Sequence, residues 1–268
     1  MYSTACYKNV TDEMVRKAVR ADKGAGAKLT SWSIEDFTKK GDNYACVVTS
    51  IKGKALVSNK EEDISYILKL NPGMSPFPSE MLAGLFKKEG TFFSEIGPIL
   101  SEVLESYNQP PLRVPKCYFA DYTAQKEILI CQDLRNLGFK MADRKKGLDI
   151  AHIKLVMKEL GRLHSAGLSL QIKDRKVKLS ERFPLYNERE YKEKMIEIFK
   201  ATMANQVEGA VNIMKKIGGF DNIIKHLKEN KDDVLKEWQN KYLYSKFPFE
   251  TIIHADCWVN NMLFRYVN

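Results

Sequence analysis

The amino-acid pattern changes near the middle of the chain, and this change limits the possible folds more than any other feature. Before Asp133 the sequence contains short runs rich in β-branched and apolar residues, whereas from Asp149 onward amphipathic helical patterns dominate. Strands packed with one helix, followed by a largely helical half, are typical of an α+β fold in two lobes. We therefore predict an N-terminal lobe of antiparallel sheet plus helix, residues 1–132, and a mainly helical C-terminal lobe, residues 133–268.

The N-terminal half is expected to contain four strands and two helical segments. The predicted strands cover residues 44–51, 64–70, 114–120 and 127–131. The polar residues 59–63 suit a hairpin connection between the first two strands. Helical spacing of apolar residues predicts a short helix over 11–21, capped by Thr11, and a longer run over 79–107 with a kink at Gly97-Pro98.

The C-terminal half is expected to be built from amphipathic helices. The periodicity predicts four of them, over residues 149–166, 188–206, 207–217 and 220–241. No internal repeat or low-complexity segment interrupts them.

Composition narrows the class of protein. Hydrophobic residues make up 44% and charged residues 29%, which excludes wholesale disorder. The net charge of +9 suits anionic ligands without choosing among nucleotide, nucleic acid and membrane surface. The five cysteines are scattered and form no CxxC pair, which favours reduced thiols. Because the sequence has no secretory signal and no apolar run of about 18 residues, we expect a cytoplasmic monomer that does not bind membranes.

The sharpest chemical signal lies near the end of the chain. Residues 254–261, HADCWVNN, have the H-x-D-x-x-x-x-N spacing of a kinase catalytic loop. In such a loop the Asp accepts or orients the proton of the acceptor hydroxyl, and the Asn turns back to hold a magnesium ion. Asp256 and Asn261 are the candidates for these roles. The motif alone is equally compatible with a turn in which both side chains satisfy backbone groups.

A second pair of residues supports the kinase hypothesis. Lys69 stands near the end of an apolar strand, Tyr66-Ile67-Leu68-Lys69, and Glu89 follows on the next helix beside Phe86 and Phe93. A kinase needs a strand Lys that reaches the α- and β-phosphates and a helix Glu that holds this Lys. Either residue alone is better explained as a surface charge. The order of Lys69, Glu89, Asp256 and Asn261 in matching secondary structure favours the functional interpretation.

Two further segments are candidates for contacts with the nucleotide. The turn that includes Gly41, Asn43 and Tyr44 precedes a strand, and its backbone amides could bind phosphate although the glycine-rich pattern of protein kinases is missing. The run 128–134 lies at the transition from strands to helices, where a bilobal kinase has its hinge. Backbone groups there could pair with adenine, so the identity of the side chains is a poor test.

Together these residues resemble the ecdysteroid kinase-like family (CHK kinase-like), a relative of choline kinases and aminoglycoside phosphotransferases. The likeness covers essentially the whole chain and keeps its order. It is carried by residues 41–45, 66–69, 86–89, 96–98, 114–118, 132–134, 138–140, 147–149, 163–165 and 258–261.

The resemblance implies a protein-kinase-like fold and ATP-dependent phosphorylation of a hydroxyl on a small molecule, with ecdysteroids or related sterols as the substrate class. By position, Asp256 resembles the catalytic Asp and Asn261 the first magnesium ligand. The family pattern makes Lys69 and Glu89 the phosphate-binding pair. The backbones of Gln132 and Leu134 would contact adenine.

The chain departs from the family pattern in three places. Ala255 stands where the family usually has Gly, and Gln132 stands where Glu is usual. The family also continues past the position of Asn261 to a strand-borne Asp that completes the magnesium site, whereas this chain ends at Asn268. Because bound metal stabilises the transition state by several kcal/mol, we expect slow turnover or none from this chain, and exposed apolar surface on the helical lobe.

Three hypotheses therefore remain. The leading one is a small-molecule kinase of this family. The second is an inactive pseudokinase or nucleotide-binding fragment that lacks the second metal-binding Asp. The third is a basic helical protein that binds nucleic acid, which we do not expect because the basic runs 144–146 and 173–178 have no interleaved aromatic residues.

Overall fold

The computed structural model describes residues 4–38, 45–73, 78–175, 177–187, 192–230 and 250–266. By its internal contacts the chain divides into two compact units. One consists of Met1–Ala166 together with Ile253–Asn268, and the other is Gly167–Ile252. The candidate residues that the structure describes all belong to the first unit.

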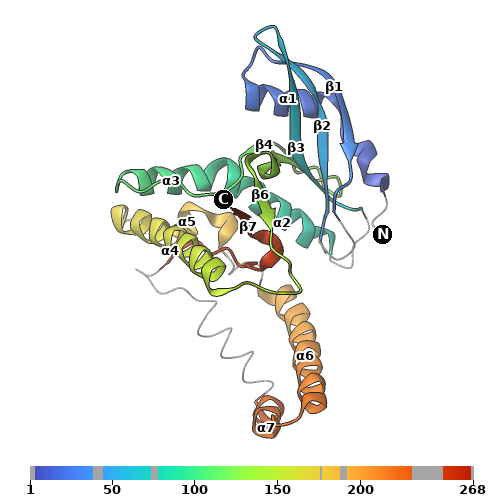
Figure 1. Cartoon of the computed structure of the whole chain (residues 1–268). Helices are drawn as coiled ribbons and strands as arrows, with labels where there is room; N and C mark the ends of the chain where they lie inside the picture. The colour runs from blue at the N-terminus through green and yellow to red at the C-terminus, as the bar shows by residue number, and fades with distance from the viewer. Residues whose placement is uncertain are drawn as a thin grey trace. The chain divides into compact units, whose positions relative to one another are not determined.

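A five-stranded antiparallel sheet forms the body of the first unit (Figure 1). Its strands are β1 (Lys28–Glu35), β2 (Val47–Val57), β3 (Lys60–Leu70), β4 (Cys117–Asp121) and β5 (Ile128–Gln132). They lie in the order β1-β2-β3-β5-β4. A separate two-stranded sheet pairs β6 (Phe139–Met141) with β7 (Leu263–Arg265), which joins the end of the described chain to the segment after β5.

The sheet differs from the predicted strands in two ways. Strand β1 was not predicted, because the polar and charged residues of its sequence hide the β pattern. The predicted hairpin is present, since β2 and β3 pair antiparallel, but its connection is shorter than residues 59–63 because β3 already begins at Lys60. Ser58 and Asn59 alone make the turn with φ values of 48° and 64°. Two successive left-handed residues form the tight turn whose twist matches that of the flanking strands.

One face of the sheet is buried in the main hydrophobic core. Side chains alternate along a strand, so every second residue of β3 points to the same face. Ile64, Tyr66, Leu68 and Leu70 are buried, and they pack with residues of β2, β5 and helix α1 (Asp12–Lys23). Helix α1 begins as predicted, because Thr11 accepts a hydrogen bond from the Met14 N–H.

The opposite face carries polar residues and is partly covered by a second helix. The helical run predicted over 79–107 consists of α2 (Ser79–Thr91), a π-helical turn (Phe92–Ile96) and α3 (Gly97–Glu105). Helix α3 begins at the predicted kink. Helix α2 comes so close to β5 that a Cβ atom on Gly90 would lie 2.9 Å from Leu129 Cδ2.

The remaining described segments are mainly helical. They are α4 (Ile150–Lys173), α5 (Leu179–Arg182), α6 (Lys192–Ile217) and α7 (Asp221–Glu229). Helix α6 is continuous, so the prediction of two helices that meet at residues 206 and 207 is wrong. None of the described helices is long and apolar enough to cross a membrane.

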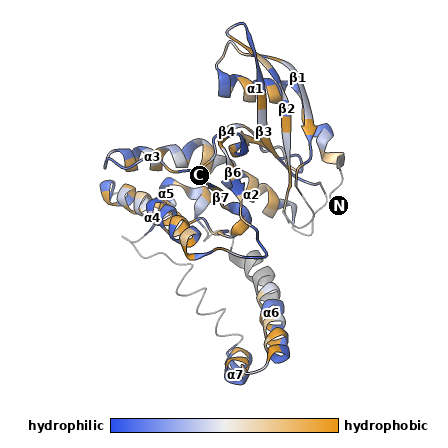
Figure 2. Cartoon of the chain, in the orientation of Figure 1, coloured by the Kyte–Doolittle hydropathy of each residue, from blue (hydrophilic) through white to orange (hydrophobic). Residues whose placement is uncertain are grey.

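Helix α4 presents apolar side chains to solvent over its first two turns. Ile150 and Met157 are more than 60% exposed, and Ile153 and Leu155 are also exposed. Figure 2 shows apolar and hydrophilic residues mixed along this helix. The helical pattern read from the sequence is therefore present, but in this half of α4 its apolar residues do not form a buried stripe.

Candidate active site

The predicted pair of Lys69 and Glu89 is in contact. Lys69 lies on the polar face of β3, and Glu89 lies on α2 next to Phe86 and Gly90, which are buried against the sheet. The Lys69 Nζ atom donates a hydrogen bond to Glu89 Oε1. Both side chains are partly exposed, Lys69 by 24% and Glu89 by 35%. The pair is thus held by the packing of α2 and remains open on one side.

The ion pair keeps Lys69 positively charged. Burial disfavours the ammonium form, but the attraction of the Glu89 carboxylate and its hydrogen bond outweigh this effect and raise the pKa of Lys69 above its usual range. A lysine with a raised pKa cannot act as a base near neutral pH. It can bind an anionic group such as a phosphate.

The strand register places other functional candidates on the same sheet face as Lys69. In an antiparallel sheet, residues opposite each other lie on one face. Lys52 is opposite Ser65, and Ser65 is four residues before Lys69 on β3. Cys131 is opposite Ile67, and Leu129 is opposite Lys69. This face therefore combines two lysines, a serine and a thiol.

Three cysteines lie beside the Lys69–Glu89 pair. Cys46, Cys117 and Cys131 pack in the cluster that contains Phe86. Burial raises the pKa of the Cys46 thiol to about 11. Cys117 and Cys131 are opposite each other on β4 and β5, and a hydrogen bond between the two thiols lowers the pKa of Cys117 and raises that of Cys131. The sequence predicted reduced thiols, but it did not predict that three of them would lie in one cluster.

The predicted hinge, residues 128–134, covers β5 and the first residue of the short helix that follows it. Gln132 is the last residue of β5, and Leu134 is the first residue of a short 3-10 helix, Leu134–Leu137. The Gln132 backbone N–H donates to the Lys116 carbonyl at 2.8 Å. Of the two backbone groups of Gln132, only the carbonyl could therefore contact a ligand. A Gln in place of the usual Glu is compatible with such a backbone contact.

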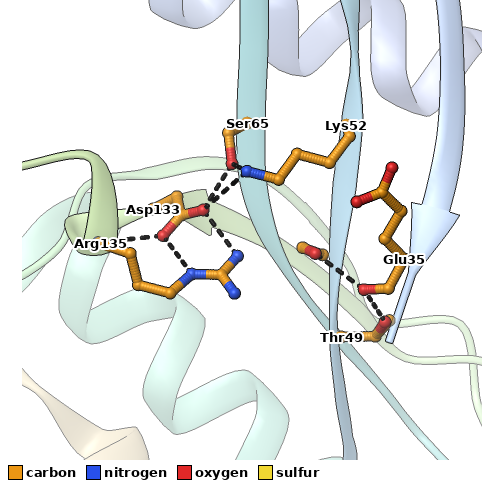
Figure 3. A network of polar contacts seen from close by, with 7 residues as sticks. Glu35, Thr49, Lys52, Ser65, Asp133 and Arg135 are labelled. Carbon is orange, nitrogen blue, oxygen red and sulfur yellow. Dashed lines mark hydrogen bonds and ion pairs between the residues drawn. The ribbon is translucent and has the colours of Figure 1, made fainter. Parts of the chain in front are cut away.

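The Asp133 carboxylate, between these two residues, is fully buried and surrounded by hydrogen-bond donors (Figure 3). Its Oδ1 atom accepts from the Arg135 N–H at 3.0 Å and from Arg135 Nε at 2.8 Å, and its Oδ2 atom accepts from Arg135 Nη2 at 2.7 Å. Ser65 donates a further hydrogen bond to Oδ2. Lys52 Nζ donates to Ser65 Oγ at 2.7 Å and lies 3.8 Å from Oδ2. We call these four residues the hinge clasp.

The hinge clasp also reaches the segment after β1. The Arg135 guanidinium lies 3.7 Å from the centre of the Phe37 ring, a cation–π contact. Phe37 precedes the turn in which Asn43 and Tyr44 were predicted to bind phosphate, and both of those residues lie outside the described part of the chain. A hollow of about 700 Å³ on this sheet face borders Lys52 and Ser65 rather than Lys69.

The predicted catalytic loop is exposed and held by short-range hydrogen bonds. Asn261 Nδ2 donates to Asp256 Oδ2 at 2.8 Å and to the Asp256 carbonyl at 2.9 Å. The Asp256 N–H points to His254 Nδ1 at 3.3 Å. The side-chain amide of Asn261 thus fixes Asp256, and the carbonyl oxygen of the same side chain remains for a ligand. Both residues are exposed, so the turn is not a buried one, although Asn261 does satisfy a backbone group, the Asp256 carbonyl.

The loop is anchored by the strand on its C-terminal side. Strand β7 begins two residues after Asn261 and pairs with β6. The His152 ring stacks edge-on against Phe264, with the ring centres 4.5 Å apart, and its Nε2 atom hydrogen-bonds the Tyr266 hydroxyl at 3.0 Å. The N-terminal turn of α4 therefore fixes the strand after the loop.

These features agree with a comparison against known protein families. A model of the ecdysteroid kinase-like family matches residues 40–268, which include all four residues of the predicted catalytic set. The chain belongs to the ecdysteroid kinase-like family. No curated protein and no solved structure matches it. Membership indicates a kinase-like phosphotransferase, and the sheet-plus-helix architecture confirms the predicted α+β fold.

The departure from the family pattern at Ala255 has a structural cost. Ala255 has a φ of 62°, in the left-handed region that favours Gly. A Cβ atom in this conformation clashes with the following carbonyl and costs roughly 1–2 kcal/mol. The loop tolerates the side chain but is strained directly before Asp256.

The Asp256–Asn261 loop supplies the types of oxygen ligand that magnesium prefers. Magnesium prefers carboxylate and amide oxygens, and Asp256 and Asn261 supply both within one turn. Among the described residues no group of three or more His, Cys, Asp and Glu side chains could hold a metal ion. A magnesium site in this part of the chain would therefore need the nucleotide phosphates or water as further ligands.

Proposed function

We propose that the protein transfers the γ-phosphoryl group of ATP to a hydroxyl of a small molecule, with an ecdysteroid or a related sterol as the acceptor. The observation that carries the proposal is the Lys69–Glu89 ion pair on an open sheet face, in a family member that also has the Asp256–Asn261 loop. We further expect a cytoplasmic monomer that binds neither nucleic acid nor membranes.

In this proposal each residue has one role. Lys69 binds the α- and β-phosphates, and Glu89 keeps its ammonium group in place. Asp256 accepts the proton of the acceptor hydroxyl or orients that hydroxyl for attack. The side-chain oxygen of Asn261 is a magnesium ligand, and magnesium, when bound, neutralises negative charge that develops on the phosphoryl oxygens.

The nucleotide is held at its other end by backbone groups. The carbonyl of Gln132 and the backbone of Leu134 would pair with adenine, and the backbone amides of Asn43 and Tyr44 would contact the phosphates. Because such contacts do not depend on side-chain type, the Gln132 departure from the family pattern costs little.

The test is phosphate transfer from Mg·ATP to a panel of sterol and non-sterol alcohols, with the product identified by mass spectrometry. Asp256→Asn should lower the rate by roughly 10²–10⁴, the usual contribution of a general base. Asp143→Asn is the matched control, because Asp143 also lies in an exposed turn and its carboxylate accepts one hydrogen bond, from the Lys145 N–H at 2.9 Å.

Two outcomes would contradict the proposal. Unchanged transfer by Asp256→Asn would show that this residue has another role. ATP binding without any phosphorylated product from the panel would favour a nucleotide-binding protein over a kinase.

A further inference from the structure

The hinge clasp is more elaborate than the capping of a short helix requires. The Asp133 side chain has no exposed surface and is bound by donors from β3 and from the start of the 3-10 helix, with Lys52 of β2 nearby. Burial disfavours its charged form, but hydrogen bonds from Arg135 and Ser65 outweigh this and lower the pKa of Asp133. A buried carboxylate adds little stability compared with an apolar residue, and its best-attested use is to select one arrangement of the backbone.

The clasp joins two segments that are distant in the sequence. Ser65 and Asp133 are 68 residues apart, and their contact extends the pairing of β3 and β5 by one residue beyond Tyr66 and Gln132. Arg135 then connects Asp133 to the Phe37 ring before β2. The hinge backbone is thus fixed to the sheet on one side and to the β1–β2 connection on the other.

We propose that Asp133, through Ser65 and Arg135, is a positioning residue that sets the hinge backbone at the distance from β3 at which adenine can pair with it. The clasp does not include the candidate phosphate ligand, because Lys69 lies four residues beyond Ser65 on the same face of the strand. The inference rests on the proposed function, because it assumes that ATP binds at this face.

This role separates adenine recognition from phosphate recognition. If the clasp positions the hinge, its loss weakens binding of ATP and leaves binding of inorganic triphosphate unchanged. If the hinge clasp only stabilises the fold, its loss weakens binding of ATP and of triphosphate equally, or weakens neither. The two probes therefore distinguish positioning from general stabilisation.

The test compares Ser65→Ala with wild type by calorimetric titration of magnesium ATP and of magnesium triphosphate. Ser65→Ala removes one hydrogen bond to a carboxylate and leaves the Asp133–Arg135 pair intact, so the chain should still fold. We expect the Kd for ATP to rise about tenfold, as loss of one charge-assisted hydrogen bond implies. The Kd for triphosphate should change by less than about twofold.

Two further variants serve as controls. Ser101→Ala removes a partly buried serine that also makes two hydrogen bonds, to the Gly97 carbonyl and from the Leu112 N–H, but lies on α3. It should change neither Kd. Ser65→Thr keeps the hydroxyl in a strand that favours β-branched residues, and should restore the wild-type ratio of the two affinities.

Each result has one meaning. A Ser65→Ala protein that binds ATP as tightly as wild type, or loses both ligands equally, overturns the inference and leaves the proposed function standing. Wild-type protein that binds neither ligand overturns the proposed function and the inference with it.

Discussion

The two halves of the candidate site are built in different ways. Lys69 and Glu89 are 20 residues apart, come from a strand and a helix, and meet because α2 packs on the sheet. Asp256 and Asn261 are five residues apart, are exposed, and are joined by hydrogen bonds within a single turn. The first pair depends on tertiary structure, whereas the second depends mainly on its local sequence.

This difference implies that the two halves respond differently to substitution. A change at the Lys69–Glu89 pair should affect both ligand binding and stability, because it leaves a partly buried charge without its partner. A change in the Asp256–Asn261 turn should affect chemistry with little effect on stability, because water can replace the lost contact.

The largest effect on ligand affinity is expected for Lys69→Met. The Kd for Mg·ATP should rise by at least about tenfold, and the free energy of unfolding should fall by roughly 1–2 kcal/mol because Glu89 loses its counter-charge. Urea unfolding and calorimetric titration measure the two quantities. Lys54→Met is the control, since the Lys54–Glu61 pair lies on the same sheet but each of its two side chains is 52% exposed. This variant should change the free energy of unfolding by less than about 0.5 kcal/mol.

Asp256→Asn tests the other half of the site, the Asp256–Asn261 turn. Its free energy of unfolding should stay within about 0.5 kcal/mol of wild type, because the side chain is exposed. Equal destabilisation by Lys69→Met and Asp256→Asn would show that the two halves are not built differently.

A comparable loss of stability is expected at Asp133, and it should depend on pH. The pKa of Asp133 is lower in the folded protein than the ordinary value of about 3.9, so its charge stabilises the fold above roughly pH 4 and this contribution disappears as the pH falls through the folded pKa. Asp133→Asn should lower the free energy of unfolding by about 2 kcal/mol at neutral pH. Urea unfolding between neutral and acidic pH should show the gap to wild type closing on the acid side, and a constant gap would contradict the assignment.

The smallest effect is expected at Ala255, and it should be favourable. Ala255→Gly relieves the left-handed strain and should raise the free energy of unfolding by about 0.5–1 kcal/mol without changing the affinity for ATP. Thermal unfolding measures the difference. Ala21→Gly, at an exposed position of α1, should instead cost about 1 kcal/mol, so a loss of stability in both variants would argue against strain at Ala255.

The comparison also explains which parts of the site were predictable from the sequence. The Asp256–Asn261 turn was predictable because its spacing is encoded in eight consecutive residues. The Lys69–Glu89 contact was predictable because an apolar strand followed by an amphipathic helix limits where the two charges can lie. The family match covers both pairs.

Contacts between polar residues on different strands could not be predicted in this way. Ser65 and Asp133 meet because of strand register, which leaves no periodic signal in the sequence, whereas Arg135 reaches Asp133 locally. An Asp followed two residues later by Arg at the end of a buried strand was the one available hint. Strand β1 was missed because most of its residues are polar or charged, although Leu29 is buried.

The three thiols beside Lys69 have a consequence for covalent ligand design. A compound that binds the Lys69 face and carries a mild electrophile should react at Cys117 before Cys46, because the thiolate is the nucleophile and the two pKa shifts have opposite signs. Cys117 and Cys46 are both half-buried, so the expected preference rests on the opposite pKa shifts of the two thiols. Selectivity of such a compound would then come from the cysteine on β4.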